Sequence, residues 1–147
     1  MSEQPTTESE RLARSIAQLI DEKQGTDIVI LDVSKPLAIV DHFVIATARN
    51  SRHANALARA LGLTMKHQGV LRRNLAGLEG ESGWVLLDFN TAVVHVFSPE
   101  AREFYGLENL WADVPRIEFT PVEPQVQPEE SWLPEPGDSY PDSIGNV

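Results

Sequence analysis

Side chains that could carry out chemistry are few in this sequence. There is no cysteine, which excludes thiolate nucleophiles, thiolate metal sites and disulfides. His95 follows Asp88 closely enough to form an acid–base pair across two strands, but no nucleophile accompanies it, because Ser98 is better explained as a helix cap. Asp32 and Asp41 could bind Mg²⁺, although a strand-end acid and a turn acid are the simpler interpretation. We expect His95 to be structural or part of an interface.

Motifs that hold phosphates or activate a nucleophile are missing from the sequence. It contains no glycine-rich phosphate loop, no G-x-S-x-G and no H-E-x-x-H. Arg49, Arg52 and His53 form a small basic group where a helix is predicted to begin, a position that can hold an anion. We favour a solvated helix start there, with a partner or RNA contact as the alternative. The sequence therefore favours a binding protein over an enzyme.

Hydrophobic spacing predicts the elements that position these residues. The predicted helices cover residues 8–24, 51–69 and 99–105. The predicted strands cover residues 28–33, 42–47, 84–88 and 92–97, with a short edge strand within 71–78 and a tight turn at 89–91. Thr7, Ser51 and Ser98 are the expected N-caps, and Gly25 and Gly106 the expected helix stops. This order predicts an α/β fold in which helices cover a sheet.

Charge is distributed unevenly along the 147 residues. Residues 121–147 hold six of the 22 acids, six of the ten prolines and no Lys or Arg, which leaves 16 acids against 12 bases in residues 1–120. We expect a disordered N-terminus over 1–7, one domain over 8–119, and an acidic, proline-rich tail over 120–147 that is extended or disordered. Trp132, Leu133 and Tyr140 could form a docking motif in the tail, although incidental residues are the simpler interpretation.

Composition also limits the partners. No basic stripe suits direct, sequence-specific binding of nucleic acid, whereas a basic protein would be attracted. No apolar run approaches the roughly 20 residues of a membrane span. The start MSEQPTTESE is too polar for a secretory signal, so we expect a cytoplasmic protein without a cofactor or metal.

The stretch from Trp84 to Trp111 is unusually rich in aromatic residues. Six large apolar side chains fall within 15 positions and alternate with charges: Phe97, Phe104, Tyr105, Leu107, Leu110 and Trp111. A short helical segment cannot bury all of them. Aromatic residues ringed by charge are typical of protein–protein interfaces.

Several ordered motifs give this chain a family resemblance. DIVILDV at 27–33, DHFVIATARNSRHANAL at 41–57, LEG at 78–80 and WVLLDFNTAVVHVFSPEAREFYGLENLW at 84–111 resemble the ribosomal silencing factor family, also called RsfS or Iojap. The resemblance covers about residues 8–112 and leaves the tail outside. Two loops differ: Phe-Asn-Thr follows Asp88 where the family commonly has Gly-Asp, and Arg49-Asn50 replaces a small link that contains glycine.

The resemblance implies a mixed sheet flanked by helices, similar to the nucleotidyltransferase fold but without its Gly-Ser and D-x-D catalytic signature. It implies a factor that binds the large ribosomal subunit through ribosomal protein fourteen and sterically blocks subunit joining, which represses translation. Whether the same surface can instead form a homodimer is a question that the resemblance leaves open. The site residues matched by motif are Trp84, Asp88, His95, Phe97, Arg102, Tyr105, Leu107, Glu108, Leu110 and Trp111.

Roles within this set follow from residue type. We expect Tyr105 and Trp111 to be aromatic anchors, Asp88 and Glu108 to face basic groups of the partner, and Trp84 and Phe97 to be the members most prone to be core. The alternatives are a nucleotidyltransferase-like enzyme acting on RNA or a small molecule, and an adaptor that reaches its target through the acidic tail.

Overall fold

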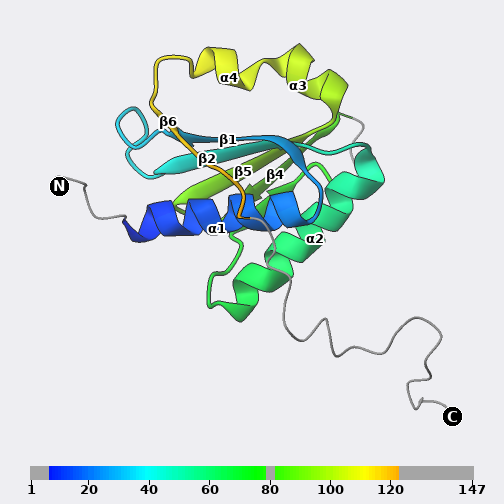
Figure 1. Cartoon of the computed structure of the whole chain (residues 1–147), viewed down its shortest axis with the longest axis horizontal. Helices are drawn as coiled ribbons and strands as arrows, with labels where there is room; N and C mark the ends of the chain where they lie inside the picture. Colours follow the sequence, from blue (N-terminus) through cyan, green and yellow to red (C-terminus); the bar gives the residue numbers. More distant parts are fainter. Residues whose placement is uncertain (1–6, 79–81, 123–147) are drawn as a thin grey trace, which may run out of the picture.

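A mixed sheet with helices on both faces forms the centre of the molecule (Figure 1). The computed structural model describes residues 7–78 and 82–122, so the expectations for the extreme N-terminus and most of the tail lie outside it. The six strands of the described part are β1 (Thr26–Asp32), β2 (His42–Thr47), β3 (Asn74–Ala76), β4 (Trp84–Asp88), β5 (Ala92–Phe97) and β6 (Arg116–Ile117). They lie in the order β3-β4-β5-β2-β1-β6, where β2 and β5 are parallel and the other neighbours antiparallel. The predicted fold class is confirmed.

Four helices cover this sheet in the described chain. They are α1 (Glu8–Glu22), α2 (Ser51–His67), α3 (Pro99–Tyr105) and α4 (Leu107–Leu110). Figure 1 shows α1 and α2 on one face and the shorter α3 and α4 on the other. None of these helices combines the length and the apolar composition needed to span a membrane.

Two details of the predicted helix ends are wrong. The cap of α2 is Asn50, whose side-chain oxygen accepts the N–H of His53 at 2.8 Å, so Ser51 is already helical. At the end of α1 the left-handed residue is Gln24, with φ of 73°, and not Gly25. Gly25 is needed for another reason: a Cβ there would collide with the side chain of Ile20.

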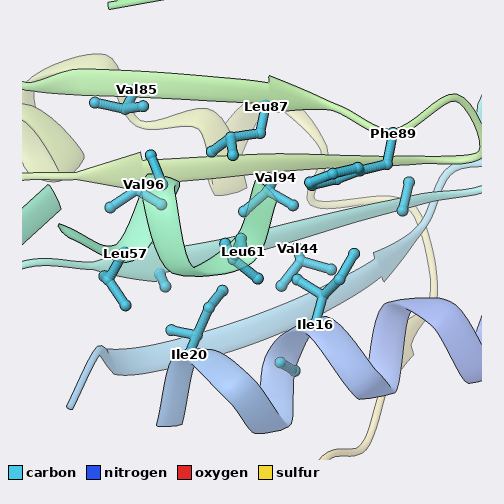
Figure 2. Packing of buried hydrophobic residues seen from close by; sticks show 14 of the residues in the cluster. Ile16, Ile20, Val44, Leu57, Leu61, Val85, Leu87, Phe89, Val94 and Val96 are labelled. Atoms are coloured by element: carbon cyan, nitrogen blue, oxygen red, sulfur yellow. The ribbon is translucent and has the colours of Figure 1, made fainter. Parts of the chain in front are cut away.

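Each face of the sheet has its own buried cluster. Under α1 and α2, helix side chains such as Ile16 and Leu61 pack against Val94 and Val96 of β5 (Figure 2). On the other face, Phe43 of β2 and Phe97 of β5 belong to a second cluster, which packs beneath α3 and α4. β2 and β5 are buried along their whole length, which fits their largely apolar sequences, interrupted only by His42, Thr47 and His95.

His53 belongs to this framework. The N–H of Arg49 donates to its Nδ1 at 3.0 Å, so its Nε2 carries the proton and donates to the carbonyl of Lys23 at 2.8 Å. The buried ring therefore joins the beginning of α2 to the end of α1. The basic group predicted around His53 is partly structural.

Candidate functional site

The helices α3 and α4 are positioned by signals that the sequence predicted. Ser98 accepts the N–H of Ala101 at 3.1 Å and so caps α3, and Pro99 occupies the first helical position. Gly106 has φ of 57°, a conformation that favours glycine, and it ends α3 and begins α4. The two short helices therefore meet at a fixed bend above the outer face of β2, β4 and β5.

Aromatic rings fill the space beneath this bend. Ring centroids of Trp84 lie 5.0 Å from those of Phe97 and 4.9 Å from those of Tyr105. At the other end, the ring of Phe43 meets that of Trp111 edge-on at 5.3 Å. We call the six residues Phe43, Trp84, His95, Phe97, Tyr105 and Trp111 the aromatic cluster. As expected, Phe97 is fully buried, while Trp84 is half-buried.

His95 lies in the middle of the aromatic cluster and is held as a neutral ring. The indole N–H of Trp84 donates to its Nδ1 at 3.2 Å, and the Phe43 centroid lies 4.6 Å from its own. Burial lowers the pKa of His95 to about 4, because the charged imidazolium would lose its hydration. Nδ1 accepts a hydrogen bond, so the proton is on Nε2, which is buried and has no partner among the described residues.

The acid–base pair considered for His95 does not form. Asp88 shares the strand β4 with Trp84, but its carboxylate accepts the N–H of Asn90 at 2.8 Å and so stabilises the turn. Asn90 itself has φ of 82°, as the turn prediction required. His95 therefore contributes to packing and hydrogen bonding.

The two metal candidates are also engaged within the chain. Asp32 accepts the N–H and the hydroxyl of Ser34, at 3.0 and 2.6 Å. Partial burial is the largest single influence on the pKa of Asp32 and raises it. The hydrogen bonds from Ser34, together with nearby positive charges, outweigh burial, so the pKa is lowered. Asp41 accepts the hydroxyl of Ser9 at 2.6 Å. No group of three or more His, Asp or Glu within the described ranges could hold a metal ion.

Arg102 and Glu108 connect α3, α4 and the sheet. The guanidinium of Arg102 donates to Glu108 at 2.8 Å and to the hydroxyl of Thr47 at 2.9 Å. The hydrogen bond from Arg102 lowers the pKa of Glu108, which therefore stays ionised at neutral pH. Arg116 adds a longer contact at 3.7 Å. Arg102 and Glu108 therefore already have charged or polar partners within the chain, and any contact with a binding partner would be additional to these.

Large apolar side chains remain on the outside of the same two helices. Phe104 is 81% exposed, Leu110 is 76% exposed and Tyr105 is 37% exposed. We call these three residues the α3–α4 ridge; Tyr105 belongs to both this ridge and the aromatic cluster, because its ring contacts Trp84 below and is partly exposed above. Leu107 and Trp111 are half-buried against the cluster below. Phe104 is absent from the predicted site set, although it lies both in the aromatic-rich stretch and in the family-like segment at 84–111.

Comparison with known proteins places this architecture in a family. A family model described as "Ribosomal silencing factor during starvation" matches residues 6–138. The chain belongs to the ribosomal silencing factor family. The matched range is wider than the motif-bearing stretch of about 8–112 and includes part of the tail that the motifs had left outside.

Individual relatives agree. A ribosomal silencing factor RsfS of Haemophilus influenzae is 36% identical over 103 residues, which are 69% of this chain and 98% of the relative. Another, from Halalkalibacterium halodurans, is 32% identical over 114 residues, 78% of this chain and 97% of the relative. Ribosomal silencing is a regulatory role and not an enzymatic one. A mouse relative carries the name mitochondrial assembly of ribosomal large subunit protein 1 and is 31% identical over 98 residues, 65% of this chain and 43% of the relative.

Solved structures show the same fold. A crystal structure from Bacillus halodurans has a TM-score of 0.66 and 30% identity, covering 75% of this chain and 99% of that one. A crystal structure from Chromobacterium violaceum has a TM-score of 0.64 and 28% identity, covering 88% and 100%. These two solved structures therefore share the overall fold of this chain.

Proposed function

We propose that this chain silences translation by docking the α3–α4 ridge on ribosomal protein fourteen of the large subunit, where its bulk blocks joining of the small subunit. Family membership supports the ribosomal partner and the silencing role. The single observation that carries the choice of surface is the exposure of Phe104 and Leu110, which the fold leaves in water although it has an apolar cluster directly beneath them.

Under this proposal, the role of each motif-matched residue depends on whether its side chain is exposed or buried. Tyr105 and Leu110 touch the partner together with Phe104, because these side chains are exposed. Trp84, His95 and Phe97 support the ridge from below. Arg102 and Glu108 fix the angle between the two helices by pairing with each other, so a rigid ridge is presented without ordering cost on binding.

Contact chemistry at the ridge is therefore mainly apolar. Exposed aromatic and aliphatic side chains on a rigid support are typical of binding hot spots, where single truncations cost about 2 kcal/mol or more. The net charge of −10 would favour approach to a basic ribosomal protein. Steric exclusion needs no chemistry at the site, which agrees with the internal engagement of His95 and Asp88.

The test compares two exposed leucines that lie on opposite faces of the sheet. Leu110 is 76% exposed on α4, and Leu63 is 61% exposed on α2, on the opposite face of the sheet. We expect Leu110→Ser to weaken co-sedimentation with large subunits by roughly 30-fold and to abolish the inhibition of subunit joining in light scattering. Leu63→Ser should leave both unchanged.

Two outcomes would contradict the proposal. The first is a purified chain that neither co-sediments with large subunits nor slows joining. The second is equal loss with both serine variants. Sedimentation of the chain with and without ribosomal protein fourteen also tests whether a homodimer competes for the ridge: a dimer held by the ridge should dissociate as the partner is added.

A further inference from the structure

A positively charged face lies on α2, across the sheet from the α3–α4 ridge. Residues 42–78 contain no Asp or Glu, yet they hold six of the 12 Lys and Arg of an otherwise acidic chain. Neither the ridge nor the core makes use of this stretch of positive charge. It therefore calls for a separate explanation.

Within this face a shallow groove combines cations with exposed apolar side chains. Arg59, Leu63 and Lys66 follow one another at helical spacing along α2, and the chain after the helix returns with Leu71 and Arg72 beside them. Leu63 is 61% exposed and Leu71 is 66% exposed. The groove measures about 460 Å³ and is lined by Arg59, Gly62, Leu63, Lys66, Leu71 and Arg72. We call it the α2 groove.

Arg72 of the α2 groove has room to lie across the helix, and no acidic side chain of the described residues forms an ion pair with the basic side chains of the groove. A Cβ on Gly62 would lie 3.0 Å from Nη1 of Arg72, so the absence of a side chain at Gly62 gives the guanidinium room to lie across the helix. In residues 7–78 and 82–122, no carboxylate forms an ion pair with Arg59, Lys66 or Arg72. An apolar centre with a cationic rim fits an occupant with an apolar centre and an acidic rim.

We propose that the α2 groove binds the chain's own C-terminal segment, residues 123–147. This segment has six acids and no base. Within it, Trp132 and Leu133 are flanked by Glu129, Glu130 and Glu135. The two apolar residues match Leu63 and Leu71 in chemistry, and the flanking carboxylates match the cationic rim.

The point at which the described chain ends supports this occupant. Val122 is held beside α1 by two hydrogen bonds with the side chain of Gln18, at 2.9 and 3.1 Å. That position is on the same side of the sheet as α2, which packs next to α1 (Figure 1). Trp132 is ten residues further on, a reach of up to about 33 Å, whereas the 17 residues of α2 span about 25 Å.

Tethering also makes a weak contact effective. Covalent attachment raises the effective concentration of the segment at the groove, so the segment can occupy it even where a free peptide of the same sequence would bind poorly. Nucleic acid phosphates are the competing occupant, but they would not use Leu63 and Leu71. Docking of the segment is independent of the ribosomal contact proposed for the opposite face.

The test takes advantage of the absence of cysteine. Ser131→Cys supplies a single site for a nitroxide label on the full chain, next to Trp132. We expect the label to broaden the backbone amide signals of Leu63, Lys66 and Leu71 and to leave those of α3 and α4 sharp. At about 0.5 M salt the broadening should fall, because exposed charges are screened within a few ångströms.

Charge reversal provides the matched controls. Lys66→Glu should remove most of the broadening, and combining it with Glu130→Lys should restore it. Lys35→Glu changes the net charge equally from an exposed loop elsewhere and should leave the broadening unchanged.

Four results would overturn the proposal. They are no broadening, broadening spread evenly over the surface, broadening that appears only between labelled and isotope-enriched copies in a mixture, and groove signals that respond to an RNA hairpin but not to the label.

Discussion

Acid should destabilise this fold through His95 before its carboxylates are protonated. The ring is 4% exposed, lies between Trp84 and Phe43, and has a pKa lowered from 6.5 to about 4 by burial. In the unfolded chain the same ring is hydrated and takes up a proton near its ordinary pKa. A folded-state pKa below the unfolded one means that stability is fully present above about pH 6.5 and is lost as the pH falls towards about 4.

The size of the effect follows from that difference. Between about pH 8 and pH 5.5 the unfolded state gains almost a full proton at this position and the folded state gains almost none, so linkage predicts a loss of about 1.4 kcal/mol. This corresponds to a tenfold change in the unfolding equilibrium constant. Both pH values lie above the isoelectric point of about 4.7, so the protein keeps a net negative charge, which limits precipitation.

Urea unfolding followed by tryptophan fluorescence at the two pH values measures this loss. His95→Phe should reduce the loss by about 1.4 kcal/mol, because it removes the titrating group. Any constant cost of leaving the Trp84 N–H without its acceptor cancels between the two pH values. His67→Phe is the control, since that ring is exposed on α2. An equal loss in the His95→Phe variant and the parent chain would refute the assigned role of burial.

Three further predictions concern the bend and the ridge above it. Gly83→Ala should destabilise the fold by about 2 kcal/mol in urea unfolding, because Gly83 has φ of 76° and a Cβ would press on the hydroxyl of Ser98 that caps α3. Glu108→Gln should weaken its bond with Arg102 and cost about 1 kcal/mol at neutral pH, and this cost should shrink as the pH falls through the lowered pKa of the parent glutamate. Trp111→Ala should abolish binding to large subunits while urea unfolding remains cooperative, and loss of the cooperative transition would assign the ring to the core.

Strand positions could be predicted well from the sequence because they depend on short-range patterns. The runs of β2, β4 and β5 have the predicted bounds, and Asn90 has the left-handed conformation expected for its turn. Ser98 and Gly106 likewise act at their own positions in the chain. β6 has only two residues and depends on pairing with β1, so its sequence carries no periodic signal.

The division of the site into core and surface could not be predicted, because it depends on distant contacts. Arg102 is turned towards the sheet by a hydroxyl at Thr47, 55 residues earlier, while Phe104, two residues later, points into water. Hydrophobicity alone would have assigned these two side chains the opposite way. The cap at Asn50 is a related case, since Asn50 and Ser51 are both good caps and only the surrounding structure decides between them.

Arg102, which is charged, faces the sheet, and Phe104, which is apolar, faces water. This arrangement is better explained by function than by stability. Placing an ion pair at 13% and 25% side-chain exposure carries a desolvation penalty that an apolar pair would avoid. Leaving Phe104 and Leu110 in water loses the free energy that their burial would provide. A chain selected for stability alone would exchange these positions. A rigid apolar ridge supported by an internal ion pair is advantageous only when the ridge is covered by something else, and in a ribosomal silencing factor that covering surface is expected on the ribosome.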